Sequence, residues 1–204
     1  MSIDEINRLA AERPDFAAIA AWIPKGASVL DLGCGDGSLL RYLKETRSVK
    51  GYGVEINDLD IVSCLVNGVN VIQNDLDSGL SDFENDAFDF VILSQTLQAT
   101  RHTEAIIKEM LRVGREGIIS FPNFGHWLNR LQILGGRMPV SRTLPYQWYN
   151  TPNVHLCTLH DFEAFCRRCA VNITARSVMM GGREVMLLSN LLGSTAVYRL
   201  QRGI

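Results

Sequence analysis

The chain of 204 residues is 47% hydrophobic and carries a formal net charge of −2 at pH 7, which is sufficient for one well-filled core and predicts a single domain over residues 1–204. Five irregularly spaced cysteines argue against a disulfide framework, and no apolar run approaches the ~20 residues that cross a bilayer. The polar, acidic start does not resemble a secretory signal, so the cytoplasm is the expected compartment and no membrane partner is expected.

Short apolar strands alternate with helical patterns along the chain, and this alternation predicts an α/β fold with a mostly parallel sheet and helices on both faces. Residues 13–27 form a lead-in with a helix over residues 14–23, because Pro14 suits a first helical turn and Pro24 follows the end. Further strands are expected at residues 29–32, 51–55, 69–73, 88–93 and 117–121, and helices at 38–44, 58–66, 103–111 and 161–169. Residues 171–178 and 184–188 are expected to form an antiparallel hairpin that completes a sheet of seven strands.

A glycine-rich turn follows the first of these strands, where Asp31 precedes Gly33, Gly35 and Gly37 at alternate positions. Glycines spaced in this way allow positive φ angles and let a ligand approach the main chain, beside the N–H groups of the helix that begins at Ser38. The dinucleotide-binding pattern G-x-G-x-x-G would need a third glycine where Ser38 stands. The pattern D-x-G-x-G-x-G instead resembles the first motif of the S-adenosylmethionine (SAM)-dependent methyltransferase superfamily, which implies a Rossmann-like class I methyltransferase fold.

Three carboxylates fall at the ends of successive expected strands, where open α/β sheets bind ligands: Asp31, Glu55 and Asp75. Any one of them alone is better explained as a helix N-cap or a turn acid, but together they favour a nucleoside ligand. Glu55 is positioned to accept the ribose hydroxyls. The resemblance implies that Asp75 accepts from the adenine amino group and that Leu76 lies against the ring. The expected site for SAM or S-adenosylhomocysteine (SAH) comprises Asp31, Gly33, Cys34, Gly35, Gly37, Glu55, Ile56, Asp75, Leu76 and Ser94.

Charge is unevenly distributed along the sequence. Residues 51–100 contain no Lys or Arg, whereas residues 117–160 contain no Asp or Glu and have Arg130, Arg137 and Arg142 as their only basic residues apart from histidine. Phosphate binding requires basic stripes beside the site, and three arginines are a small footprint for RNA. No nucleic-acid partner is therefore expected.

Residues 135–158 have no obvious helical or strand periodicity, and they contain three prolines and a close succession of large apolar side chains from Leu144 to Tyr149. A connection this long in a compact domain is typical of a lid or a binding loop, and its aromatic content favours an ordered segment. Trp, Tyr and Arg dominate protein–protein hot spots, which indicates a docking surface. The alternative is that the aromatic side chains pack back as a cap on the sheet edge.

Motifs over most of the chain, from residue 13 to about residue 188, resemble the family of the methionine biosynthesis protein MetW. They are Arg13-Pro14-Asp15, L-S-Q-T-L-Q at 93–98, E-M-L-R-V-G-R at 109–115, S-F-P-N-F-G-H-W at 120–127, G-R-M-P-V at 136–140 and L-P-Y-Q-W-Y-N-T-P-N-V-H-L-C-T at 144–158. The resemblance implies a small methyltransferase-fold protein that associates with a homoserine O-acyltransferase of the MetX type and is needed for its full function. We expect residues 135–158 to make that contact.

Two functions from different classes remain open: a SAM-binding partner or activator of the acyltransferase, and a SAM-dependent methyltransferase whose small-molecule acceptor is held by Arg137 or Arg142. No catalytic residue is assigned, because each histidine is better explained as a hydrogen-bonded structural residue. The four histidines are His102, His126, His155 and His160. No metal site is expected, because Cys166 and Cys169 have C-x-x-C spacing within an amphipathic helix but lack a second pair.

Overall fold

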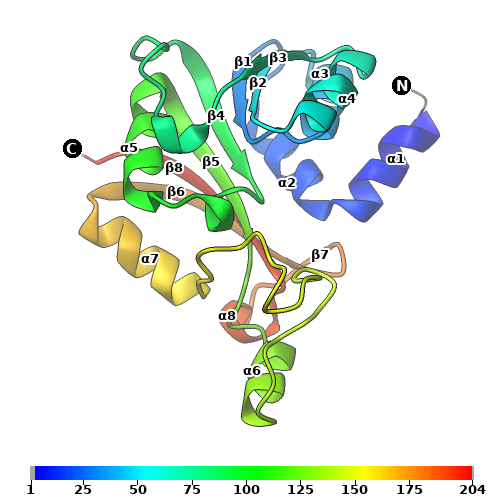
Figure 1. The fold of residues 1–204 in the computed structure, drawn as a ribbon, viewed down its shortest axis with the longest axis vertical. Coiled ribbons are helices and arrows are strands. Elements are labelled where there is room, and N and C mark those ends of the chain that lie inside the picture. Colours follow the sequence, from blue (N-terminus) through cyan, green and yellow to red (C-terminus); the bar gives the residue numbers. More distant parts are fainter. Residues whose placement is uncertain (1–2, 204) are drawn as a thin grey trace.

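The computed structural model describes residues 3–203, and its centre is one sheet of eight strands in the order β3-β2-β1-β4-β5-β8-β6-β7 (Figure 1). Strands β1 to β5 pair in parallel, and β6, β7 and β8 join them through antiparallel pairs. The strands are β1 (Ser28–Leu32), β2 (Lys50–Glu55), β3 (Asn70–Gln73), β4 (Phe88–Ser94), β5 (Gly114–Pro122), β6 (Val171–Met180), β7 (Arg183–Glu184) and β8 (Thr195–Arg202).

Helices cover both faces of the sheet, with α2 and α3 on one face and α5 and α7 on the other (Figure 1). The α-helices are α1 (Ile3–Glu12), α2 (Pro14–Trp22), α3 (Ser38–Arg47), α4 (Asp58–Val66), α5 (Thr103–Val113), α6 (Trp127–Leu134), α7 (Leu159–Arg168) and α8 (Ser189–Leu192), and the short 3₁₀ helices are η1 (Leu76–Ser78) and η2 (Leu97–Ala99). Within residues 3–203, none of these helices combines the length and the apolar composition that crossing a membrane requires.

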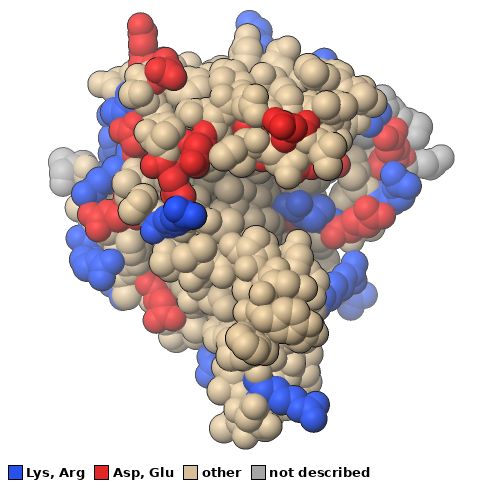
Figure 2. Space-filling view, viewed as in Figure 1, with Lys and Arg blue, Asp and Glu red and all other residues tan. Residues whose placement is uncertain are grey.

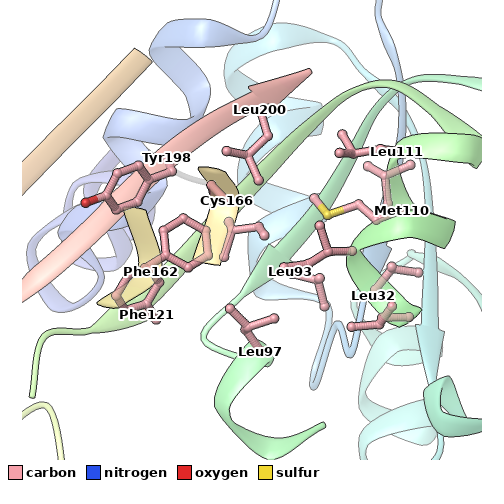
Figure 3. Close-up of a cluster of buried hydrophobic side chains, with 14 of the residues drawn as sticks. Leu32, Leu93, Leu97, Met110, Leu111, Phe121, Phe162, Cys166, Tyr198 and Leu200 are labelled. Atoms are coloured by element: carbon pink, nitrogen blue, oxygen red, sulfur yellow. The ribbon is translucent and has the colours of Figure 1, made fainter. Parts of the chain in front are cut away.

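The sheet separates two apolar cores, because successive side chains of a strand point to opposite faces. Leu30 and Leu93 belong to the core beneath α5 and α7, whereas their neighbours Val29 and Ile92 belong to the core beneath α2 and α3. Figure 3 shows the first of these cores, where Met110 of α5 lies beside Leu93. All five side chains are fully buried, and burial of each contributes roughly 1.5–3 kcal/mol. The central strands are therefore the most firmly held part of the fold, and their carboxyl ends are a rigid support for a site.

The antiparallel end of the sheet contains the expected hairpin but has one strand more than expected. Strand β6 turns at Gly181 and Gly182, which have φ of +55° and +81°, but β7 is only two residues long and residues 185–188 leave the sheet. The partner of β6 along most of its length is β8, a strand that was not expected and that lies between β5 and β6. Ala196, Val197 and Tyr198 are fully buried, so β8 is packed on both faces. The expected antiparallel end hairpin is thus confirmed as the pair β6–β7, although β7 is shorter than expected, and the sheet has eight strands rather than seven because β8 is inserted between β5 and β6.

The parallel part of the sheet confirms the sequence analysis. The expected helix over residues 58–66 coincides with α4, and the other expected elements are found with ends shifted by one to three residues. Three helices were not expected: α1, the short α8, and α6, which follows β5 and projects from the body of the molecule (Figure 1). Residues 135–158 follow α6 and have almost no regular structure, apart from an isolated bridge between Ser141 and Leu144.

Candidate functional site

The glycine-rich turn connects the carboxyl end of β1 to α3, as expected. Gly33, Gly35 and Gly37 have φ of +69°, +55° and +77°, a backbone conformation that residues with a Cβ rarely adopt. A Cβ at Gly33 would lie 2.5 Å from Thr96 Cγ2, whereas a Cβ at Gly35 would meet nothing within 4 Å. Gly33 is therefore packed against the segment after β4, and Gly35 faces open space at the end of the strands.

Asp31 lies at the base of this turn and is only 1% exposed. Its Oδ1 has no hydrogen-bond partner within residues 3–203. Burial raises the pKa of this carboxyl group to about 7, the nearby Arg13 guanidinium lowers it, and the negative charges of Glu55 and Asp15 raise it further. A buried acceptor without a donor is costly, so Asp31 is a group to which a cationic ligand can add the missing hydrogen bond.

Glu55 links the end of β2 to the turn. Its Oε2 accepts a hydrogen bond from the Gly35 N–H at 2.9 Å, and its Oε1 accepts from the Ile56 and Asn57 N–H groups at 2.8 and 2.9 Å. A carboxylate offers about four lone-pair positions, so one position remains on Oε2. That position can accept one ribose hydroxyl, and a second hydroxyl requires the Gly35 N–H to release Oε2.

The expected adenine side of the site lies at the ends of β2 and β3. Ile56 is 58% exposed and offers an open apolar surface. Asp75 is exposed, and its Oδ1 accepts from the Asp77 N–H at 2.9 Å, which caps η1. Leu76 is half-buried and packs against the core. Asp75 thus has the N-cap role that is the alternative to a ligand contact for a single acid.

Cys34 packs beneath the turn rather than towards an open surface. Its Sγ lies 3.7 Å from the Sγ of Cys64 in α4, and Gly53 of β2 leaves the space that it occupies. Burial raises the pKa of both thiols above the ordinary value. The thiolate is the reactive form of cysteine, so these two residues are neutral packing groups at physiological pH.

Ser94, an expected site residue and the last residue of β4, belongs to a hydrogen-bonded cluster. Its other members, Arg13, Asp15 and Ser120, were not expected at the site. Asp15 of α2 is 2% exposed, and its carboxylate accepts from Arg13 Nε at 3.0 Å, Arg13 Nη2 at 2.8 Å and Ser120 Oγ at 3.0 Å. Arg13 Nη2 also donates to Ser94 Oγ at 2.8 Å. The cluster fixes the start of α2 over the ends of β4 and β5 and holds a guanidinium beside Asp31. Both charged residues of the cluster belong to the motif Arg13-Pro14-Asp15, whose only signal in the sequence is the family resemblance.

Three of the four histidines lie beside groups outside the turn. His126 is buried, its Nε2 lies 3.2 Å from Met180 Sδ, and burial lowers its pKa, which keeps the ring neutral. His155 Nε2 lies 3.3 Å from the carbonyl oxygen of Arg101. The ring of His160 lies 3.3 Å from the side-chain amide of Asn190. These contacts support structural roles for all three.

Cys166 of the C-x-x-C pair is likewise part of the packing. Cys166 is fully buried among the aromatic side chains under α7, as Figure 3 shows, and burial raises its pKa to about 12. Within the described part of the chain, no three His, Cys, Asp or Glu side chains are grouped in a way that could hold a metal ion.

Residues 135–158 place their aromatic side chains in solvent. Tyr146, Trp148 and Tyr149 are 48%, 72% and 71% exposed, and the last two rings meet edge to face with their centroids 5.7 Å apart. Leu144 is buried and anchors the segment. Large apolar side chains of the adjacent α6 are also exposed, and Figure 2 shows the projecting end of the molecule as mostly uncharged, with blue but no red atoms around its tip. Trp148 and Tyr149 thus do not cap the sheet edge, and an apolar surface with basic residues around it remains.

Comparison with known proteins adds the family. The family model of the methionine biosynthesis protein MetW matches residues 13–200. The bifunctional methionine biosynthesis protein MetXA/MetW of Rhodopirellula baltica is 40% identical over 157 residues, which are 72% of this chain and 25% of that protein. The chain therefore spans about a quarter of the length of this curated relative.

Solved structures share the fold. A SAM-dependent methyltransferase from Thermotoga maritima superposes with a TM-score of 0.67 at 18% identity, covering 98% of this chain and 95% of that one. The magnesium protoporphyrin IX methyltransferase of Synechocystis, solved with bound SAH, gives a TM-score of 0.65 at 18% identity, covering 100% and 89%. At identities this low, the superpositions establish only the Rossmann-like methyltransferase fold. The family model that matches residues 13–200 is what identifies the family. The chain belongs to the family of the methionine biosynthesis protein MetW.

Proposed function

We propose that this chain binds SAM or SAH at the glycine-rich turn and acts as the partner or activator of a homoserine O-acyltransferase of the MetX type. The observation that carries the proposal is the relative that combines MetXA and MetW in one protein, because a fused chain keeps its two parts at high effective concentration. The five cysteines of the chain are all free thiols, which supports the cytoplasm as the compartment.

The residues around the turn fit SAM. Asp31 Oδ1 offers a buried acceptor to the ammonium group of the methionine part, and Arg13 provides a cation for its carboxylate. Glu55 Oε2 has room for a ribose hydroxyl, and Ile56 provides apolar surface for the adenine ring, with Asp75 and Leu76 just after the adjacent strand β3. Bound SAM supplies a methyl group activated by its sulfonium, whereas these residues supply recognition and shape.

The surroundings of the turn support binding more than methyl transfer. Transfer to a hydroxyl or an amine usually needs a base positioned on the acceptor. His126, His155 and His160 are each engaged with other groups, and Ser94 belongs to the Arg13–Asp15 cluster. Methyl transfer to a small molecule held by Arg137 or Arg142 therefore stays the alternative, with no specific contact in its favour.

Residues 135–158 are proposed as the docking segment for the acyltransferase. Exposed Trp and Tyr side chains with arginines nearby are the composition of interface hot spots. Trp148 and Tyr149 hold one another in an edge-to-face pair, so little side-chain entropy is lost on association. The absence of acidic residues between positions 117 and 160 favours a partner surface that carries carboxylates.

Calorimetric titration of the purified chain with SAM, without and then with a homoserine O-acyltransferase, tests the proposal. SAM binding together with formation of the complex supports it. SAM binding without a complex, accompanied by SAH release when small-molecule acceptors are added, would favour the methyltransferase alternative. If SAM does not bind but the complex forms, the turn is an inherited scaffold and the docking surface alone is the function.

A further inference from the structure

Helix α4 carries an apolar face that is open to solvent. Its only buried residue is Cys64. Four of its apolar side chains are exposed, by 79%, 57%, 65% and 83% for Leu59, Val62, Leu65 and Val66. A helix on the surface of a globular protein normally turns its apolar stripe towards the core. Four exposed apolar side chains on a helix of nine residues are instead typical of a surface that another protein covers.

This face is separate from the proposed docking segment. Helix α4 packs beside β3, the edge strand of the sheet, whereas α6 and residues 135–158 lie at the far end of the molecule (Figure 1). The two surfaces also differ in charge, because residues 51–100 contain no Lys or Arg and residues 117–160 contain no Asp or Glu. Docking of an acyltransferase at residues 135–158 therefore does not account for the face of α4.

The spacing of the exposed residues favours a second helix as the covering element. Leu59, Val62 and Val66 follow one another at intervals of three and four residues, which places them in one stripe and is the spacing of a coiled-coil seam. Such a stripe can pack against its own copy. When two α4 helices lie antiparallel around a two-fold axis, Leu59 of each copy meets Val66 of the other, and Val62 of both copies lies next to the axis.

Two cations of α3 lie at the C-terminal end of α4. Arg41 Nη1 donates to Asn67 Oδ1 at 3.1 Å and also pairs with Glu5 at 3.1 Å. Lys44 is exposed, and its Nζ donates to the Gly68 carbonyl oxygen at 3.4 Å. The side of α4 that faces α3 is therefore basic at this end.

The same side of α4 is acidic at its other end. Asp60 lies in the first turn and Asn67 follows the last one, and residues seven apart share one side of a helix. Antiparallel packing around a two-fold axis brings the Asp60 end of each copy to the Lys44 end of the other. Parallel packing would bring like charges together at both ends. The charges around α4 are thus complementary to those of a second copy of this chain in the antiparallel arrangement.

We propose that the chain forms a two-fold dimer through antiparallel α4 helices. Leu59, Val62 and Val66 form the centre of the contact, and Asp60 and Lys44 lie at its rim. A helix of nine residues offers a contact at the small end of specific interfaces, so we expect a dissociation constant of about 10–100 µM. The dimer rests neither on SAM binding nor on the acyltransferase, so it is tested on the chain alone.

Sedimentation equilibrium of the full chain, at concentrations below and above this range, measures the association. We expect a reversible equilibrium between monomer and dimer. A chain that stays monomeric well above the expected dissociation constant would overturn the proposal. Trimers or open-ended polymers would overturn it as well, because an isologous contact is complete when two copies have met.

Matched variants on the two exposed helices locate the contact. Val62→Arg places like charges next to the two-fold axis and should weaken the dimer by more than about tenfold. Leu134→Arg makes the same kind of change on α6, at a residue that is 82% exposed, and should leave the dimer unchanged. Circular dichroism and Tm show that each variant folds. Dimerisation of folded Val62→Arg at the natural affinity would overturn the proposal, as would a monomeric chain in which Val62→Arg weakens binding of the acyltransferase.

A charge exchange tests the antiparallel arrangement. Asp60→Lys and Lys44→Glu each replace two attractive rim contacts of the dimer by repulsive ones, so each should weaken the dimer by roughly fivefold. The double variant restores opposite charges at both ends and should recover most of the natural affinity. Only a partner that is itself a copy of this chain changes together with it. A double variant that associates more weakly than either single variant would overturn the assignment.

Discussion

Asp31 combines two properties that rarely occur together in a residue kept only for structure. It is a carboxyl group at 1% exposure, and one of its oxygens has no donor within the described residues. Structural acids under such burial are normally satisfied by several hydrogen bonds, as Asp15 is by Arg13 and Ser120. We therefore interpret the unpaired oxygen as the proposed contact for the ammonium group of SAM.

That cost gives a pH-dependent stability. The pKa of Asp31 is about 7 in the folded chain and near 3.8 when unfolded, so the folded state binds the extra proton between these values and loses stability as the pH rises through 7. Asp31→Asn has no proton to lose. We expect its Tm at pH 8 to exceed that of the natural protein by about 4 °C or more, and the difference to shrink towards pH 5. Asp82→Asn, at an exposed acid, is the control, and a difference of the same size at both pH values would contradict the explanation.

The affinity for SAM should depend on the same protonation of Asp31, but affinity should rise with pH, whereas stability falls. An ammonium group binds the ionised form of Asp31, so lowering the pH through 7 forces the ligand to compete with a proton. One proton and a pKa of about 7 predict that affinity is roughly eightfold weaker at pH 6 than at pH 7.5. Calorimetry at the two pH values measures the ratio. In the variant Asp31→Asn we expect SAM to bind weakly and with the same affinity at both pH values. If the affinity of this variant still depends on pH, a group other than Asp31 takes up the proton.

Gly35 tests the location of the site directly. Its φ is +55° and its missing Cβ faces open space, so Gly35→Val places a branched side chain where the nucleoside is proposed to bind. We expect SAM binding to be lost in calorimetry. Gly26 has φ of +78° and equally open surroundings before β1, at the other end of the strands, so Gly26→Val imposes a similar backbone strain away from the site. If both variants bind SAM equally, the turn is not the site.

The sequence pattern located the turn and its acids but missed Arg13 and Asp15. Alternate glycines impose a backbone conformation that few other residues adopt, so the pattern itself carries the structure. Arg13 and Asp15 reach the site because α2 is laid across the ends of β4 and β5, where Ser94 and Ser120 hydrogen-bond to them. That placement depends on tertiary packing, which no local spacing in the sequence encodes.

Individual elements were predictable where a local rule determines them. Helix α4 was found with its ends because Asn57 caps it, accepting from the Leu59 and Asp60 N–H groups at 2.9 and 3.3 Å. Strand β8 was missed because a strand buried on both faces lacks the alternation that marks a strand with one exposed face. Helix α6 was missed because it buries only Asn129, so its apolar residues do not form a core-facing stripe.

Trp148 tests the proposed docking segment. Trp148 is 72% exposed, so Trp148→Ala should leave Tm almost unchanged while weakening association with the acyltransferase by about 2 kcal/mol. The comparison variant is Tyr52→Ala on β2, an aromatic residue that is 44% exposed near the opposite edge of the sheet. Association constants from surface plasmon resonance decide between them. Equal weakening by both variants, or none by Trp148→Ala, would remove residues 135–158 from the interface.

Across the whole molecule, one short segment connects the proposed SAM site to the docking segment. Thr96 Oγ1 donates to the Gly33 carbonyl oxygen at 3.2 Å in the turn, and two residues later the Gln98 carbonyl oxygen accepts from the Val154 and His155 N–H groups. Gln95, between β4 and these contacts, has φ of +58°, which is a strained conformation for a residue with a Cβ. A movement of the turn on ligand binding therefore has a direct mechanical route to the end of residues 135–158.

This connection predicts that SAM and the acyltransferase change one another's affinity. A coupling of 1 kcal/mol or more, which is about fivefold, is typical where two sites share a rigid segment, and thermodynamic linkage requires the same factor in both directions. Titrations of SAM with and without the acyltransferase, and of the acyltransferase with and without SAM, measure both factors. Thr96→Ala removes the contact with Gly33 and should bring both factors towards one, while each partner still binds alone. A ligand shifts an equilibrium only through its difference in affinity for the two states. If SAM binds the free chain and the complex with the same affinity, SAM binding is therefore not coupled to binding of the acyltransferase.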